Sequence, residues 1–210
     1  MTFYRFARAV AFSLCKVVFR VHITGIENVP TAGAYIVAPT HRSILDVPFA
    51  AFITRRTICF LTKSELFANP VLCRLFTTLG AVRVERGTAD RGALRALESV
   101  LREGSPVAVF PEGTRGSGPA ITPLFDGAAF LALKLGVPII PVGIGGSEGI
   151  LPKGKVLPRI CRVAVVVGEP IVPPALDSRA RRAAATRLTG ELRDELQRSF
   201  SDALRLAGAR

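Results

Sequence analysis

Residues 106–115 read Pro106-Val-Ala-Val-Phe-Pro-Glu-Gly-Thr-Arg115, and they change from an apolar run to a polar loop. The apolar part, 106–110, is short and almost uninterrupted, which is typical of a strand that is buried on both faces of a sheet. Helical patterns precede and follow it, at 89–103 and 125–135. A buried strand between two helices is the repeating unit of an α/β fold.

The same alternation of strands and helices extends over most of the chain. Further strands are predicted at 34–38, 57–61, 81–84, 137–142 and 162–167, and further helices at 43–54 and 64–79. We therefore expect a single α/β domain with a mostly parallel or mixed central sheet flanked by helices. The 210 residues, 49% of them hydrophobic, suffice for one substantial core and exclude a disordered chain.

Amphipathic helices are predicted at both ends of the chain. Over residues 3–20, the basic side chains fall within an arc of roughly 120° and face away from an aliphatic and aromatic side. This is typical of a helix on an anionic membrane surface, although a helix that covers the core gives the same pattern. We therefore predict an amphipathic membrane-associating helix at 1–20 and one domain at 21–210. A long C-terminal helix is expected over 178–206, where apolar residues recur every four positions: Leu188, Leu192, Leu196 and Phe200.

The chain is strongly basic, with 28 Lys and Arg against 16 Asp and Glu and a net charge of +12. This charge predicts anionic partners, which means nucleic acid, an anionic membrane or phosphate-bearing substrates. Nucleic acid is disfavoured, because the chain has no Trp, only two Tyr and no recognisable reading motif. No uncharged run reaches the ~18 apolar residues of a spanning helix. The four scattered cysteines indicate reduced thiols in a cytosolic setting.

Two local patterns that suggest other enzymes fail on their context. Residues 145–149 spell G-x-S-x-G, but a serine hydrolase needs a helix directly after the serine and a later histidine, and the sequence offers neither. Residues 149–156 resemble a nucleotide-binding loop, but Val156 replaces the Ser or Thr that holds Mg²⁺. Pro158 then blocks the helix that should follow.

Residues 40–49, Thr40-His-Arg-Ser-Ile-Leu-Asp-Val-Pro-Phe49, contain one of the two histidines of the chain, five positions before Asp46. An imidazole exchanges protons near neutral pH, and a carboxylate beside it holds its tautomer. The alternative is a capping box, in which Ser43 and Asp46 only satisfy backbone N–H groups at a helix start. Both roles fit if His41 lies in the turn before the helix and Asp46 in its first turn. One carboxylate oxygen would then face the ring, and the other would face the backbone.

Three further segments follow in order: Gly80-Ala-Val-Arg-Val-Glu-Arg86, Phe110-Pro-Glu-Gly-Thr-Arg115 and Val137-Pro-Ile-Ile-Pro-Val142. With His41 and Asp46 they resemble the glycerolipid acyltransferase family, and in particular the 1-acyl-sn-glycerol-3-phosphate (lysophosphatidic acid) acyltransferases. That family's pattern runs H-x-x-x-x-D, G-x-x-F-I-x-R, F-P-E-G-T-R and V-P-I-x-P. The resemblance covers about residues 20 to 170, and F-P-E-G-T-R is the most specific of its motifs.

The resemblance implies a role for each of the matching residues. His41 would be the catalytic base, and Asp46 would orient it. Arg86 and Arg115 would hold the phosphate of the acceptor, because a planar guanidinium binds phosphate bidentately. Lys63 would add a further cationic contact to that phosphate.

The remaining substrate-binding residues implied by the resemblance belong to the F-P-E-G-T-R motif. Glu112 would hydrogen-bond the glycerol of the acceptor or order Arg115. Gly113 would let the backbone approach closely, and Thr114 would add a hydroxyl contact. Asp126 stands where the family often has a lysine, which leaves the head group of the acceptor open.

The implied reaction moves a fatty acyl group from acyl-CoA or acyl carrier protein to the free hydroxyl of 1-acyl-sn-glycerol-3-phosphate, giving phosphatidic acid. We expect no metal and no bound cofactor, and a peripheral position on an anionic lipid surface at the cytoplasmic face of the cell membrane. Two alternatives stay open. One is the same chemistry on glycerol-3-phosphate, on another hydroxyl or on a glycolipid. The other is a non-catalytic protein that binds anionic membranes.

Overall fold

The computed structural model describes residues 10, 12–14, 16–63, 81–84, 89–150, 159–177 and 180–208, with the backbone alone for 61–63, 81–84 and 89–91. Seven strands form one sheet in the order β1-β7-β6-β2-β5-β3-β4. Neighbouring strands are parallel, except that β6 and β7 run antiparallel. The prediction of a mixed, mostly parallel sheet is therefore confirmed. The strands are β1 His22–Thr24, β2 Ile36–Pro39, β3 Cys59–Lys63, β4 Ala81–Val84, β5 Val107–Ala108, β6 Ile139–Gly145 and β7 Ala164–Val167.

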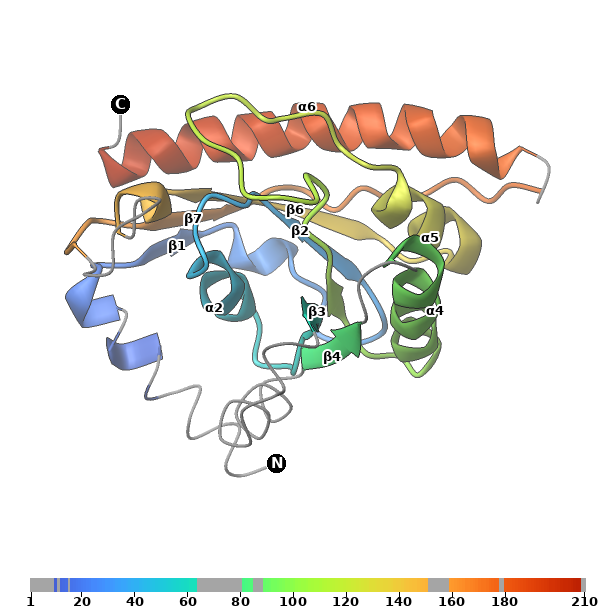
Figure 1. The fold of residues 1–210 in the computed structure, drawn as a ribbon, viewed down its shortest axis with the longest axis horizontal. Helices are drawn as coiled ribbons and strands as arrows, with labels where there is room; N and C mark the ends of the chain where they lie inside the picture. Colours follow the sequence, from blue (N-terminus) through green and yellow to red (C-terminus); the bar gives the residue numbers. More distant parts are fainter. Residues whose placement is uncertain are drawn as a thin grey trace.

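Helices cover both faces of this sheet (Figure 1). Their bounds are α2 Asp46–Ala51, α4 Ala89–Arg102, α5 Gly127–Leu135 and α6 Arg181–Ala207. Helices α4, α5 and α6 pack over one face, and α2 packs over the other. Alternate residues of β2 enter the two cores: Val37 lies in the core beneath α2, whereas Ile36 and Ala38 lie in the core beneath the other helices. Burial on both sides explains why the strands read as continuous apolar runs.

The structure moves several predicted boundaries. Helix α2 begins at Asp46 rather than at residue 43. Strand β1 was not among the strands predicted from apolar runs, because it has only three residues, none of them fully buried. The family resemblance alone implied a strand in this stretch. The C-terminal helix α6 is confirmed, and its four-residue repeat lies in the buried face. The helix predicted at 64–79 lies outside the described residues.

Glycines in β6 let α6 lie directly against the strand. A Cβ atom added at Gly143 would lie 2.2 Å from the Ser199 carbonyl oxygen, and one at Gly145 would lie 2.4 Å from the Ala203 carbonyl carbon. Real Cβ atoms do not approach backbone this closely, so these two positions exclude any larger residue. The two glycines thus set the distance between the longest helix and the sheet.

The N-terminal segment is helical at residues 10, 12–14 and 16–18. One side of it covers the core, since the Phe12 ring packs edge-on against Phe52 at a centroid distance of 5.0 Å. The other side is exposed and apolar, with Val10, Leu14 and Val17 at 51%, 62% and 77% exposure. Arg5 and Arg8 of the predicted basic stripe lie outside the described residues, so the division at residue 20 stays a prediction. None of the helices in the described ranges has both the length and the apolar composition needed to cross a membrane.

Candidate active site

The segment that holds His41 and the F-P-E-G-T-R loop meet at one edge of the sheet. His41 comes two residues after β2, and Phe110 comes two residues after β5. Strands β2 and β5 are parallel neighbours, so the loops at their carboxyl ends emerge side by side, where ligands bind in open α/β sheets. The rings of His41 and Phe110 lie 4.2 Å apart between centroids, at an interplanar angle of 36°.

His41 and Asp46 are brought together by the start of α2. His41 lies in the turn before the helix, and Asp46 is the first residue of the helix. The distance between His41 Nδ1 and Asp46 Oδ2 is 3.3 Å. The His41 side chain keeps 19% of its surface exposed, whereas that of Asp46 is fully buried. The imidazole is therefore held at Nδ1, and no hydrogen bond from the described residues reaches its Nε2.

The capping box forms only in part, and Asp46 uses its oxygens differently from the expectation. Oδ2 faces both the ring and the backbone, because it also accepts hydrogen bonds from the Arg42 and Ser43 amides. Oδ1 is buried without a hydrogen-bond partner among the described residues. The Ser43 hydroxyl accepts a hydrogen bond from the Leu45 amide at 3.4 Å instead of capping residue 46. One oxygen thus couples the imidazole to the turn that precedes α2.

Glu112 has protein partners rather than the contacts implied by the resemblance. Its carboxylate is buried and accepts hydrogen bonds from Arg42 Nη1 at 2.8 and 2.9 Å, from Thr122 Oγ1 at 2.7 Å and from the His41 amide at 3.1 Å. Among the described residues, no hydrogen bond or ion pair joins it to Arg115. Glu112 binds Arg42 and Thr122, and its two implied roles, a contact with the glycerol of the acceptor or the ordering of Arg115, remain predictions.

Burial alone would raise the pKa of Glu112, but hydrogen bonds from Thr122, Arg42 and the His41 amide, together with the charge of Arg42, outweigh it. The pKa therefore lies below the ordinary value of 4.5. A group whose pKa is lower in the folded than in the unfolded chain stabilises the fold above its unfolded pKa, and this contribution is lost as the pH falls through the folded pKa.

This shift predicts a pH dependence of stability. Thermal unfolding of the wild type should give a Tm that is level near neutral pH and falls as the pH drops below about 4.5. Glu112→Gln should have a lower Tm at neutral pH and a shallower fall in acid, because it has no proton to take up there. If the Tm of the two proteins falls equally steeply as the pH drops below about 4.5, the assigned pKa shift of Glu112 is contradicted.

Four of the other predicted substrate-binding positions lie on or near the same edge: Gly113, Thr114, Arg115 and the backbone of Lys63. Gly113, Thr114 and Arg115 are exposed on the loop after β5. Gly113 has φ = 67°, and a Cβ there would lie 2.6 Å from the Phe125 ring, so the turn requires glycine. The backbone of Lys63 ends β3, which pairs with β5, but its side chain lies outside the described residues. Arg86 also lies outside them.

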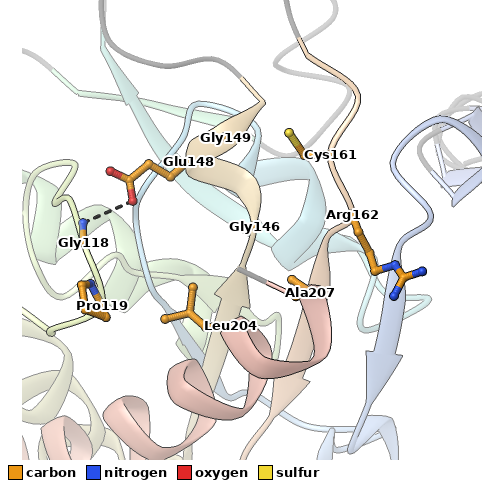
Figure 2. Close-up of a pocket in the computed structure, with 10 residues that line it drawn as sticks. Gly118, Pro119, Gly146, Glu148, Gly149, Cys161, Arg162, Leu204 and Ala207 are labelled. Atoms are coloured by element: carbon orange, nitrogen blue, oxygen red, sulfur yellow. Dashed lines mark hydrogen bonds between the residues drawn. The ribbon is translucent and has the colours of Figure 1, made fainter. Parts of the chain in front are cut away.

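A cavity of about 410 Å³ is lined in part by Gly118 and Pro119, which belong to the segment that follows the F-P-E-G-T-R motif. Glu148, in the short 3-10 helix η3 (Ser147–Gly149), accepts a hydrogen bond from the Gly118 amide at 3.2 Å (Figure 2). The Arg162 side chain extends away from Glu148 (Figure 2). His41 is not among the residues that line this cavity.

Comparison with known proteins assigns the sequence that forms this site to a family. The family model described as Acyltransferase matches residues 20–145, which is more than half of the chain and includes His41, Asp46 and Arg115. The chain belongs to the acyltransferase family.

Relatives in the acyltransferase family carry consistent names. The chain is 32% identical over 183 residues to a 1-acyl-sn-glycerol-3-phosphate acyltransferase of Chlamydomonas reinhardtii, covering 83% of this chain and 54% of that protein. It is 29% identical to the enzyme of that name from Bacillus subtilis (strain 168), covering 81% of this chain and 85% of that one. The chain spans 54%, 40% and 39% of three of the curated relatives it matches, and so about half of their length or less.

A solved structure supports the fold. The crystal structure of the 1-acyl-sn-glycerophosphate (LPA) acyltransferase PlsC from Thermotoga maritima matches with a TM-score of 0.66 at 26% sequence identity. The match covers 90% of this chain and 80% of that one. A single α/β acyltransferase domain is therefore shown.

Arg42 and Thr122 belong to the site but were not predicted from the sequence. Arg42 stands inside the H-x-x-x-x-D pattern, where the pattern assigns no role. Thr122 lies ten residues after its partner Glu112, in a loop without a motif. The local sequence carries no signal for either, because Glu112, Gly118 and Ala120 lie at least 70 positions from Arg42, and Thr122 stands in no motif.

Proposed function

We propose that this protein is an O-acyltransferase that moves a fatty acyl group from acyl-CoA or acyl carrier protein to the free hydroxyl of 1-acyl-sn-glycerol-3-phosphate. The products are phosphatidic acid and the free thiol. The observation that carries the proposal is the His41–Asp46 pair at 3.3 Å beside the F-P-E-G-T-R loop. The names of the relatives from Chlamydomonas reinhardtii and Bacillus subtilis support the choice of acceptor.

The reaction needs one base that later acts as an acid. His41 Nε2 accepts the proton of the acceptor hydroxyl while the oxygen forms a bond with the thioester carbonyl carbon. Asp46 holds the Nδ1 tautomer and stabilises the imidazolium. When the tetrahedral intermediate collapses, the C–S bond breaks and His41 returns the proton to the leaving thiolate. The acyl group passes directly between the substrates, so no covalent enzyme intermediate and no cofactor enters the scheme.

The acceptor's phosphate would lie above the carboxyl ends of β5, β3 and β4. Arg115 is exposed on the loop after β5, and Lys63 ends the neighbouring strand β3. Arginine suits this task because its guanidinium donates two parallel hydrogen bonds to phosphate oxygens. Arg86, which follows β4 in the sequence, is proposed as the third cation.

The decisive experiment incubates the purified protein with a panel of lysolipids and glycerol-3-phosphate, each with acyl-CoA and with acyl carrier protein. Mass spectrometry should detect phosphatidic acid from 1-acyl-sn-glycerol-3-phosphate. A product formed from glycerol-3-phosphate or a glycolipid instead would assign the same chemistry to another acceptor. If no thioester gives a product with any acceptor, the remaining alternative is a non-catalytic protein that binds anionic membranes.

Arg115→Ala should raise the apparent KM for a phosphorylated acceptor by about 10- to 100-fold, because a hydrogen bond to a charged group contributes ~1.5–3 kcal/mol. Kinetics with an acceptor that lacks phosphate provide the comparison, and there the KM should not change. Arg193→Ala, at an exposed position of α6, controls for the loss of one positive charge. An equal change with both acceptors would remove Arg115 from the phosphate site.

We also propose that the N-terminal helix holds the protein on a membrane surface as a peripheral protein at the cytoplasmic face. Support comes from the exposed apolar row of Val10, Leu14 and Val17, on the side of the helix that faces away from Phe52. Apolar side chains on one face and basic residues on another are typical of helices that lie in a lipid interface.

The double variant Leu14→Glu with Val17→Glu should bind vesicles of anionic phospholipid at least ~10-fold more weakly than the wild type, because burial of each apolar side chain contributes ~1.5–3 kcal/mol. Vesicle co-sedimentation measures the effect. Val172→Glu, at an equally exposed apolar position elsewhere, is the matched control and should bind as the wild type does. Unchanged binding of the double variant would place the anchor outside this row.

A further inference from the structure

Arg42, the residue after His41, is buried and hydrogen-bonded in several directions, unlike a solvated surface arginine. Its guanidinium is almost fully buried, and it donates hydrogen bonds to Glu112 and to the carbonyl oxygens of His41, Gly118 and Ala120. We propose that Arg42 is a positioning residue of the acyl transfer: it fixes the turn of the catalytic base against the loop that carries the phosphate-binding Arg115. This inference rests on the function proposed above.

The first link joins Arg42 to the F-P-E-G-T-R motif. Nη1 lies 2.8 Å from Glu112 Oε1 and 2.9 Å from Oε2, and the same Oε1 accepts the His41 amide at 3.1 Å. Glu112 therefore accepts hydrogen bonds from the His41 backbone amide and from the Arg42 guanidinium at the same time. A buried ion pair keeps such a geometry only when its remaining polar atoms are also satisfied, and Thr122 satisfies the second oxygen.

The second link joins Arg42 to the backbone after the motif. Nε donates to the Gly118 carbonyl at 3.2 Å, and Nη2 donates to the Ala120 carbonyl at 3.0 Å. The Gly116 amide in turn donates to the His41 carbonyl at 2.9 Å. A Cβ at Gly116 would lie 2.5 Å from Arg42 Nη1, so this loop rests directly on the guanidinium. Residues 116–120 are thus tied to the residues beside the base.

The third link joins Arg42 to α6. The Arg42 guanidinium carbon lies 4.8 Å from the centre of the Phe200 ring, which is buried. A planar guanidinium can stack on a ring while its edge donates in several directions, and a lysine ammonium cannot do both. The site therefore requires arginine for its shape as well as its charge.

These three links determine the kinetic effect of losing Arg42. A small displacement of His41 relative to the acceptor lowers kcat, and a displacement of the Arg115 loop raises the KM for the acceptor. The proposed scheme assigns none of the residues in these three links to binding of the thioester donor, so the KM for the donor should stay constant. A role limited to stability would change the Tm without this pattern.

The test compares Arg42→Lys with Arg102→Lys. Arg102 pairs with Glu98 on the exposed surface of α4, so it controls for an arginine-to-lysine change in an ion pair. Arg42→Lys should lower kcat by ~10- to 100-fold, as small misplacements of reacting groups do. It should also raise the acceptor KM and leave the donor KM unchanged. Arg102→Lys should match the wild type in all three.

Hydrogen exchange read by mass spectrometry supplies a measurement that does not depend on turnover. In Arg42→Lys, amides of residues 113–122 should exchange faster, whereas those of α4 should exchange as in the wild type. Adding millimolar guanidinium to Arg42→Ala should restore part of the kcat in a saturable way, far below the molar range that unfolds proteins. It should have no such effect on Arg102→Ala.

The outcomes separate this inference from the proposed function. Wild-type kcat and unchanged exchange at 113–122 in Arg42→Lys would overturn the positioning role. A wild type that acylates no acceptor would overturn the function, and the exchange result would still test the contacts of Arg42. If Arg42→Ala does not fold, the kinetics and exchange of the folded Arg42→Lys protein decide.

Discussion

His41→Ala is expected to lower kcat/KM for acyl transfer by ~10²–10⁴-fold, because the variant has no group that can take the hydroxyl proton. In the scheme proposed above, the imidazole is the only base, and the same group returns the proton to the thiolate. Transfer of a labelled acyl chain to 1-acyl-sn-glycerol-3-phosphate, at saturating donor, measures the loss.

Asp46→Asn separates orientation from proton transfer. The amide keeps the size of the carboxylate but loses the charge that stabilises the imidazolium, so an intermediate loss of kcat is expected. The Tm of both variants shows whether the turn before α2 survives, since Asp46 Oδ2 also accepts the Arg42 and Ser43 amides. A folded His41→Ala protein with near-normal turnover would remove His41 from the mechanism.

Gly143→Ala is expected to cause a large loss of stability through a single added methyl group. The new Cβ would lie 2.2 Å from the Ser199 carbonyl oxygen and 2.4 Å from the Phe200 nitrogen, so the backbone of α6 would have to move. Overpacking costs ~1–3 kcal/mol of stability. The upper end is expected here because the new Cβ would meet helix backbone rather than a flexible side chain. The Tm should fall by about 6–12 °C, at ~2–4 °C for each kcal/mol in a chain of this size.

Gly190→Ala is the matched control, because it adds the same methyl group within α6 itself. Gly190 is exposed, and no atom would lie within 4 Å of its added Cβ. Alanine is more stable than glycine in a helix interior by ~0.8–1 kcal/mol, so this variant should unfold at a higher temperature than the wild type. Similar Tm values for the two variants would contradict the close contact of α6 with β6.

The fold was predictable from the sequence because its signal is local. Each buried strand is a run of consecutive apolar residues, and the four-residue repeat of α6 lies in one segment. Errors arose where tertiary contacts decide the local structure. Helix α2 begins later than predicted because the Asp46 carboxylate binds the amides of residues 42 and 43 before the helix starts. Strand β1 depends on pairing with β7, some 140 residues away in the sequence, since its own three residues carry little pattern.

The site was predictable only in part. The spacing of His41 and Asp46 places them correctly, because both lie within one turn and the helix start that follows it. Arg42 could not be found in this way, since its partners Glu112, Gly118 and Ala120 are 70, 76 and 78 positions away. Motif order indicates which residues share an edge of the sheet, but it does not show which of them bind one another.

Helix α6 follows every other described element of the domain in the sequence, and it supplies Phe200 to the guanidinium beside the base. During translation, His41, Asp46 and the F-P-E-G-T-R loop therefore leave the ribosome well before the aromatic ring that completes their surroundings. A nascent chain without this helix would have the motifs in place, but one face of β6 would be bare and Arg42 would lack its stacking partner. Synthesis of α6 thus supplies both the cover of this face of β6 and the aromatic ring that contacts Arg42.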